Sequence, residues 1–147
     1  MILPGYGVGD VIVVSQLVST VYAAYKNAPK GYRDICGEIK LLEMRINKAI
    51  PYIQGTTLSD DDRHEGQEIL TSCQSVLEDL NSLIEKYSLA SAKSGQIVKK
   101  VQFGTEDIAA LRARLILNIG LLNGFIQRFD IPTITIYQVY HANLSQL

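Results

Sequence analysis

The side chains that most often carry enzyme chemistry are few in this sequence and do not cluster. There are two histidines, His64 and His141, and two cysteines, Cys36 and Cys73, and no two of them lie within a few residues of each other. A closed zinc site needs four such ligands, usually with some of them closely spaced along the chain. We therefore expect no metal site, and we interpret the cysteines as free interior thiols of a reducing compartment.

Two further motifs have the residue types of binding sites without the required spacing. The run Asp60-Asp61-Asp62 offers carboxylates for a cation, but no EF-hand spacing follows it. These acids instead suit the positive end of a helix dipole. The glycine-rich start lacks the strand and lysine of a phosphate-binding loop, so we interpret it as a flexible N-terminal segment, with glycines Gly5, Gly7 and Gly9.

The sequence also offers no set of residues for nucleophilic catalysis. Such catalysis requires a nucleophile, a base and an orienting group, and the serines here are scattered among residues that supply neither partner. We expect no catalytic residue, no cofactor and no enzyme activity. A hydrolase assembled from residues distant in the sequence is the enzymatic alternative.

Charge is distributed unevenly although the net charge is only −1. Residues 59–87 carry eight acidic and two basic side chains, whereas residues 88–147 carry three acidic and six basic ones. No segment has the density of lysine and arginine that phosphate neutralisation demands, so nucleic acid is not an expected partner. The N-terminus lacks the positive region of a secretory signal, and no run of 18 residues is wholly apolar, which predicts a cytoplasmic protein.

Apolar residues recur at helical spacing through nearly the whole chain. We expect helices over residues 10–27, 32–53, 59–87 and 105–129 and, after Pro132, over 132–147. Asp10, Ser59 and Thr105 are the expected N-caps, and Pro51 is expected to kink or end the second helix. Gly120 and Gly124 are expected to allow close helix approach. The prediction is an all-α fold: a single domain over residues 1–147, built as a four-helix bundle with an additional C-terminal helix.

The first helix differs from the others because residues 11–25 carry no charge. Apolar side chains fall on nearly every face, which favours a central hydrophobic N-terminal helix enclosed by its neighbours. The alternative is a segment that leaves the bundle and acts as a membrane or oligomer helix. The residues proposed for this membrane or oligomer helix are Val11, Ile12, Val13, Val14, Leu17, Val18, Val21, Tyr22 and Tyr25.

The free energy of membrane insertion and the length of the helix both favour the enclosed helix over spontaneous insertion. Val, Ile and Leu contribute about −0.3 to −0.6 kcal/mol each to membrane insertion, or roughly −2 to −4 kcal/mol for this helix. The polar side chains of Ser15, Gln16, Ser19 and Thr20 offset much of that. The uncharged run spans about 22 Å, less than the roughly 30 Å hydrocarbon core of a bilayer. Insertion would therefore need several copies acting together, and both states remain open to one protein.

Several short blocks of the sequence resemble one protein family. The start Gly5-Tyr6-Gly7-Val8-Gly9-Asp10, the block from Tyr32 to Leu42 and the block from Val101 to Asn123 together resemble the fungal N-terminal domains of STAND proteins. These are HeLo-like domains that precede NACHT or NB-ARC modules. Tyr6 and Val8 replace the aromatic residue and the serine that are commoner in the family. Residues 131–147 match no part of the pattern. The resemblance covers residues 5–129.

The resemblance implies a helical bundle that relays regulated cell death and non-self recognition. It implies self-association on activation, downstream nucleotide-binding and repeat domains as partners, and membrane lipids as targets of the first helix after relocation to the plasma membrane. The alternative is a homotypic adaptor, a protein-interaction bundle without membrane activity. In that case the acidic residues 60–68 of one copy would meet Lys93, Lys99 and Lys100 of another.

Overall fold

The computed structural model describes residues 8–91 and 108–129, and this part of the chain is helical and contains no strand. The helices are α1 (Val8–Lys26), α2 (Lys30–Arg33), α3 (Cys36–Gln54), α4 (Asp60–Ser91) and a last helix, Ile108–Phe129, called here the 108–129 helix. The predicted all-α class is confirmed. The expected helix 132–147, the Thr105 cap, and Gly5 and Gly7 lie outside the described residues.

The N-terminal ends of two helices test the expected caps. α1 begins at Val8, so Asp10 lies inside its first turn and is not the N-cap. Gly9 is likewise part of α1 and does not precede it as a flexible residue. The start of α4 is as predicted, because the Ser59 hydroxyl oxygen accepts a hydrogen bond of 3.1 Å from the backbone N–H of Asp62. The three acids of the first turn therefore lie at the positive end of a capped helix.

The second expected helix is divided, and its proline does not end it. A turn at Asp34 and Ile35 separates α2 from α3. The glycines Gly31 and Gly37 flank this turn, and glycine disfavours continuous helix by about 1 kcal/mol relative to alanine. α3 then continues through Pro51 to Gln54, and the Pro51 carbonyl oxygen accepts a hydrogen bond of 3.0 Å from Gly55 N–H.

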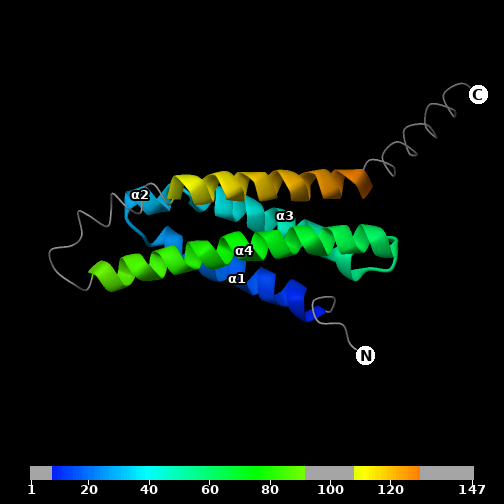
Figure 1. Cartoon of the computed structure of the whole chain (residues 1–147), viewed down its shortest axis with the longest axis horizontal. Coiled ribbons are helices and arrows are strands. Elements are labelled where there is room, and N and C mark those ends of the chain that lie inside the picture. Colours follow the sequence, from blue (N-terminus) through cyan, green and yellow to red (C-terminus); the bar gives the residue numbers. More distant parts are fainter. Residues whose placement is uncertain (1–7, 92–107, 130–147) are drawn as a thin grey trace, which may run out of the picture.

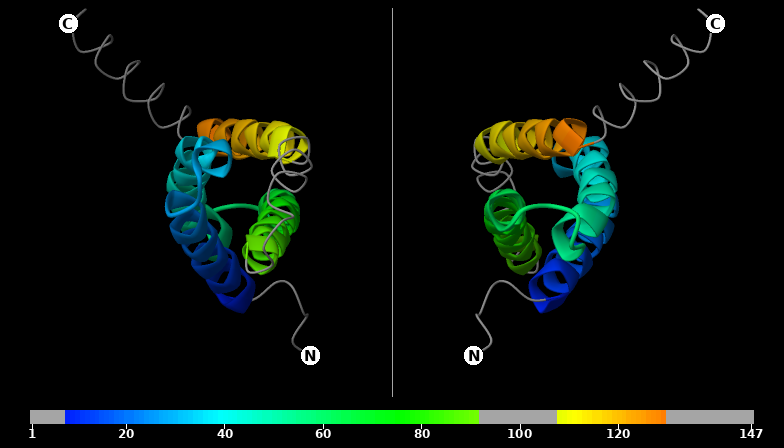
Figure 2. Two further views of the ribbon diagram at one scale, coloured as in Figure 1. Left: turned by 90° about the vertical axis from the view of Figure 1, so that its left-hand side faces the viewer. Right: turned by 90° about the vertical axis from the view of Figure 1, so that its right-hand side faces the viewer.

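The described helices share one hydrophobic core. α1 packs against both α3 and α4, and the 108–129 helix lies on the other side of the α3–α4 pair (Figures 1 and 2). Each long helix contributes a stripe of buried residues at three- and four-residue spacing, as helical geometry requires. The most deeply buried large side chains include Tyr25, Ile39, Leu42, Leu80, Leu115 and Phe125.

The prediction that α1 is enclosed on every side is wrong. Its buried residues follow one stripe, Val11, Val14, Val18, Val21 and Tyr25. Between them the helix presents the exposed polar residues Gln16, Ser19 and Thr20. Ile12 and Val13 are each 46% exposed. Small and polar residues on the outer side allow α1 to form one wall of the structure, although none of its residues 11–25 is charged.

One glycine permits a close helix contact, and it is not one of those expected. A Cβ atom on Gly66 of α4 would lie 2.7 Å from Phe125 Cζ and 2.8 Å from Ile53 Cγ1. Gly66 thus lets the 108–129 helix and the end of α3 approach α4. Among the described residues, no atom lies within 4 Å of the corresponding position at Gly120 or Gly124. These two glycines face outward, so the expected close approach does not occur at them between the described helices.

Candidate interaction surface

The residues examined for catalysis or metal binding are separate from one another in the described part of the chain. His64 lies beside Glu68 on the surface of α4, with 3.0 Å between Nε2 and Oε1, and His141 lies outside the described residues. Cys36 and Cys73 are free thiols, and burial raises the pKa of Cys73 to about 12. No group of three or more His, Cys, Asp and Glu side chains in residues 8–91 and 108–129 is arranged to hold a metal ion.

A shallow groove lies where the end of α1 meets the C-terminal half of α4. Its volume is about 620 Å³, and its lining is mainly apolar or neutral. Glu85 is the one charged side chain among the residues that line it, and no histidine or cysteine takes part. The groove therefore offers packing surface and lacks the paired titratable groups that acid–base chemistry uses.

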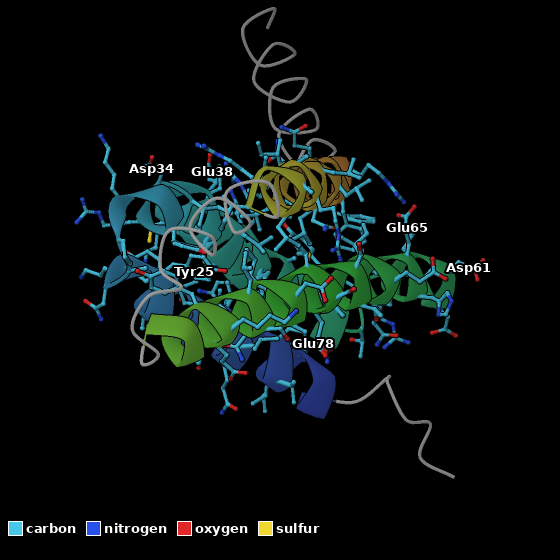
Figure 3. The ribbon with its side chains drawn as sticks, turned by 60° about the vertical axis from the view of Figure 1, so that its left-hand side comes forward. Tyr25, Asp34, Glu38, Asp61, Glu65 and Glu78 are labelled. Atoms are coloured by element: carbon cyan, nitrogen blue, oxygen red, sulfur yellow. The ribbon has the colours of Figure 1, made fainter. Side chains whose placement is uncertain are left out.

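The residues proposed for a membrane or oligomer helix differ in burial, and only some of them lie in the core. Five of them, the stripe from Val11 to Tyr25, belong to the core, Leu17 and Tyr22 are half-buried, and Ile12 and Val13 are exposed. Tyr25 points into the interior between α1 and α4 (Figure 3), where its hydroxyl donates a 2.5 Å hydrogen bond to the Leu80 carbonyl oxygen. Burial, with Tyr32 nearby, raises the pKa of Tyr25. α1 is thus fixed by polar as well as apolar contacts.

A polar contact also joins the outer side of α1 to α3. The Ser19 hydroxyl donates a hydrogen bond of 2.7 Å to Glu43 Oε2, and Lys40 donates one of 2.6 Å to Glu43 Oε1. These two donors lower the pKa of Glu43, since they favour its ionised form. The contact keeps the uncharged helix paired with a charged neighbour.

The inner face of the 108–129 helix completes the core. Leu115, Leu122, Phe125 and Ile126 are buried against α3 and α4. Among them lies Asn118, the one buried polar side chain in the described part of the chain. Its Oδ1 accepts a hydrogen bond of 2.7 Å from the Ser72 hydroxyl, and its Nδ2 donates one of 3.0 Å to the Arg114 carbonyl oxygen. Both halves of the amide therefore have partners, as burial of an amide requires.

Arginines along the sides of this helix are paired with acids of the neighbouring helices. Arg112 donates to Glu38 of α3, and Arg114 lies 2.6 Å from Asp79 of α4. At the far end Arg128 contacts Glu65, and its second guanidinium nitrogen lies 3.0 Å from Asp62 Oδ1. Figure 3 shows Glu65 on α4 directed toward the 108–129 helix. The three cations are thus balanced within the chain.

The outer face of the same helix is apolar, which is unusual for a surface. Ile116, Leu117 and Leu121 are 53%, 63% and 44% exposed. They lie among small exposed residues on the same side of the helix, and the whole set, called here the outer face, is Ala109, Ala110, Ala113, Ile116, Leu117, Gly120, Leu121 and Gly124. No charged residue interrupts this set over four turns, and continuous exposed apolar patches are typical of interaction sites.

Within the described residues, the 108–129 helix is also the one that is long and apolar enough to cross a membrane by length and composition alone. Its inner face, its buried Asn118 and the four ion pairs of its three arginines connect it to α3 and α4. A transmembrane position would require all these contacts to be broken. The contacts therefore favour a bundle helix with one solvent-facing apolar side.

No family model, curated protein or solved structure matches the chain. The outer face was not found by sequence reasoning, although its signal is present. Residues 116, 117, 120, 121 and 124 are apolar or small at helical spacing, opposite the stripe that predicts the core. The 108–129 helix is apolar on two opposite sides, and its arginines lie along the borders between these sides. The core of the chain buries only one of the two apolar sides.

Proposed function

We propose that this chain is the N-terminal signalling domain of a fungal NLR-like protein and that it acts by self-association when its receptor oligomerises. The proposal treats α1, α3, α4 and the 108–129 helix as one four-helix bundle, to which residues 131–147 add a C-terminal helix. The observation that carries self-association is the outer face, where Ile116, Leu117 and Leu121 are about half exposed. The resemblance over residues 5–129 supports the receptor context.

The test is to fuse the chain to an inducible dimerisation module and express it in the cytoplasm of a fungal host. Induced clustering should arrest growth or kill the cells if the domain relays a death signal. Leu117→Glu should abolish the response, because it places a charge in the middle of the outer face. Met44→Glu is the matched control, since Met44 is 57% exposed on α3 and outside that face. A chain that is expressed and folded but silent on clustering would refute this function.

A second candidate, membrane insertion of α1 after relocation to the plasma membrane, is favoured by the exposure of Ile12 and Val13. Full release of α1 would uncover the five buried residues from Val11 to Tyr25. At about 1.5–3 kcal/mol for each large apolar side chain, that costs roughly 7–15 kcal/mol, whereas insertion returns only roughly 2–4 kcal/mol. Insertion therefore requires the receptor to drive the release.

Leakage of vesicles tests this second candidate, and the structure indicates which residue to change. Val14 and Val18 are buried, so a charge at either would strongly destabilise the fold and would obscure any effect on insertion. Val13→Glu changes the exposed side of α1 and leaves the core intact. Leakage that depends on clustering and is lost with Val13→Glu would support insertion. Leakage unchanged by Val13→Glu, or no leakage on clustering, would exclude it.

A further inference from the structure

The outer face of the 108–129 helix has large and small residues in an order that suits pairing with itself. Leu117 projects from the middle of this face, and Gly120 lies one turn further along. Among the described residues, no atom lies within 4 Å of the Cβ position of Gly120 or Gly124, so the surface has open space at both glycines, where no side chain projects. The surface thus contains both the projections and the hollows that a close helix pair requires.

We infer that the outer face binds the same face of a second copy of this chain, with the two 108–129 helices antiparallel about a two-fold axis between residues 118 and 119. In this register Leu117 fits over Gly120 of the second copy, and Gly120 receives Leu117 in return. Ile116 lies opposite Leu121, and Ala113 lies opposite Gly124. Such reciprocal contacts define an isologous interface. The inference rests on the proposed function in naming self-association, and adds its surface, orientation and register.

The charges around the outer face favour a second copy over a partner of opposite charge. The three arginines beside the outer face are paired within the chain, with Glu38, with Asp79, and with Glu65 and Asp62. Within the described residues, the borders of the face therefore have no unbalanced arginine to attract an acidic peptide or an anionic surface. An antiparallel pair also opposes the two helix dipoles, whereas a parallel pair would align them.

The size of the face determines the strength of the pairing. Residues 109–124 span roughly 22 Å of helix, and a contact of one helix per copy is smaller than the about 800 Å² per partner that stable complexes bury. The dimer should therefore be weak and dependent on concentration. Clustering by a fused receptor raises the effective concentration of the copies, and a larger fraction of them then forms the dimer. A weak pair is thus suited to a domain that must stay single until its receptor assembles.

Sedimentation of the full chain from micromolar to millimolar concentration tests the pairing. The mass should rise from one copy to two, and Leu117→Glu should raise the Kd by about 30-fold or more, as expected at the centre of an interface. Gly120→Ala should weaken association while raising the thermal stability of the dilute monomer, because its methyl group meets open space only in the single copy. Met44→Glu should change neither quantity.

The orientation is tested by mixing two single variants. Ile116→Glu and Leu121→Lys should each abolish association alone, because each faces an apolar residue of an identical copy. An equal mixture should form heterodimers, since the new acid lies opposite the new base only in the antiparallel register. Failure of the mixture to associate, while the unchanged chain does, would overturn the antiparallel arrangement.

Other outcomes identify other occupants of the face and overturn the inference. A folded chain that remains single at millimolar concentration has no such pairing. A dimer unaffected by Leu117→Glu uses another surface, and flotation with phosphatidylcholine–phosphatidylserine vesicles that Leu117→Glu abolishes would indicate a lipid. If the chain pairs as described but clustering in cells is silent, the proposed function fails alone. If clustering works equally with Leu117→Glu, this inference fails alone.

Discussion

α1 and the 108–129 helix occupy opposite sides of the α3–α4 pair, yet they use their apolar residues in different ways. α1 has no charge in residues 11–25 and places four valines and Tyr25 on one buried stripe, with polar residues, Ile12 and Val13 outside it. The 108–129 helix contains three arginines and has the larger exposed apolar surface. Absence of charge therefore does not identify the surface that is available to partners. The positions of apolar residues around each helix do.

The largest effect on stability is expected when the same negative charge is placed on each of the two helices. Val18→Glu buries a carboxylate among α1, α3 and α4, and should lower the free energy of unfolding by more than about 4 kcal/mol. Leu117→Glu changes an exposed position and should alter it by no more than about 0.5 kcal/mol in dilute solution. Urea unfolding followed by circular dichroism measures both. Equal losses in the two variants would mean that the outer face is covered in the monomer.

A second pair of variants compares two glycines. Gly66 of α4 contacts the inner face of the 108–129 helix, and Gly120 lies on the outer face of that helix. Gly66→Ala should destabilise the fold by about 1–3 kcal/mol, because the new methyl group overlaps Phe125 and Ile53. Gly120→Ala should stabilise it by about 0.5–1 kcal/mol, since it improves helix propensity without a clash. Thermal unfolding of dilute protein gives both signs. A stabilising Gly66→Ala would contradict the close contact.

The stability of the core should also be sensitive to high pH. The pKa of Cys73 is raised to about 12 from an ordinary 9.0, so the folded state keeps this proton where the unfolded chain loses it. Stability should be constant below pH 9 and fall by up to about 1.4 kcal/mol per pH unit between pH 9 and 12. Tyr25, whose pKa is also raised, adds to the loss above about pH 10.

Cys73→Ala separates the two groups. Between pH 9 and 10 the variant should lose the slope of stability against pH that Cys73 causes, although its overall stability is lower because of the cavity. Tyr25→Phe should change the slope only above about pH 10. Urea midpoints at fixed pH values provide the measurement, and identical slopes in the unchanged protein and Cys73→Ala would disprove the burial of this thiol.

The smallest expected effect concerns the ion pairs that flank the outer face. Arg114→Ala removes a half-exposed pair with Asp79 and should lower the free energy of unfolding by less than about 1 kcal/mol. Added salt should reduce the difference from the unchanged protein. Denaturation in low and high salt measures it. A loss of several kcal/mol would show that these arginines fix the 108–129 helix more firmly than its apolar inner face does.

The helices and most of the core residues could be predicted from the sequence. Which face of each helix is buried or exposed could not be predicted in full. Ser59 with three following acids predicts a helix start because capping is a local interaction. Apolar residues at three- and four-residue spacing from Ile69 to Tyr87 predict the packed face of the same helix, because helical periodicity can be read from the local sequence. The break before α3 and the exposure of Ile12 could not be foreseen, since they depend on which neighbours lie nearby. Gly66 and Gly120 have the same local signal, and only tertiary contacts distinguish them.

The hydrogen bond between Ser72 and Asn118 has a consequence for motion. If the 108–129 helix slid along α4 by one turn, about 5.4 Å, the Asn118 amide would leave the Ser72 hydroxyl, and Arg114 and Arg128 would leave Asp79 and Glu65. Losing a buried hydrogen bond together with these ion pairs is costly, so the contacts favour the present alignment of the two helices over a shifted one. Any message that crosses this domain must then travel by separation or joining of whole helices, and not by a ratchet-like shift between them.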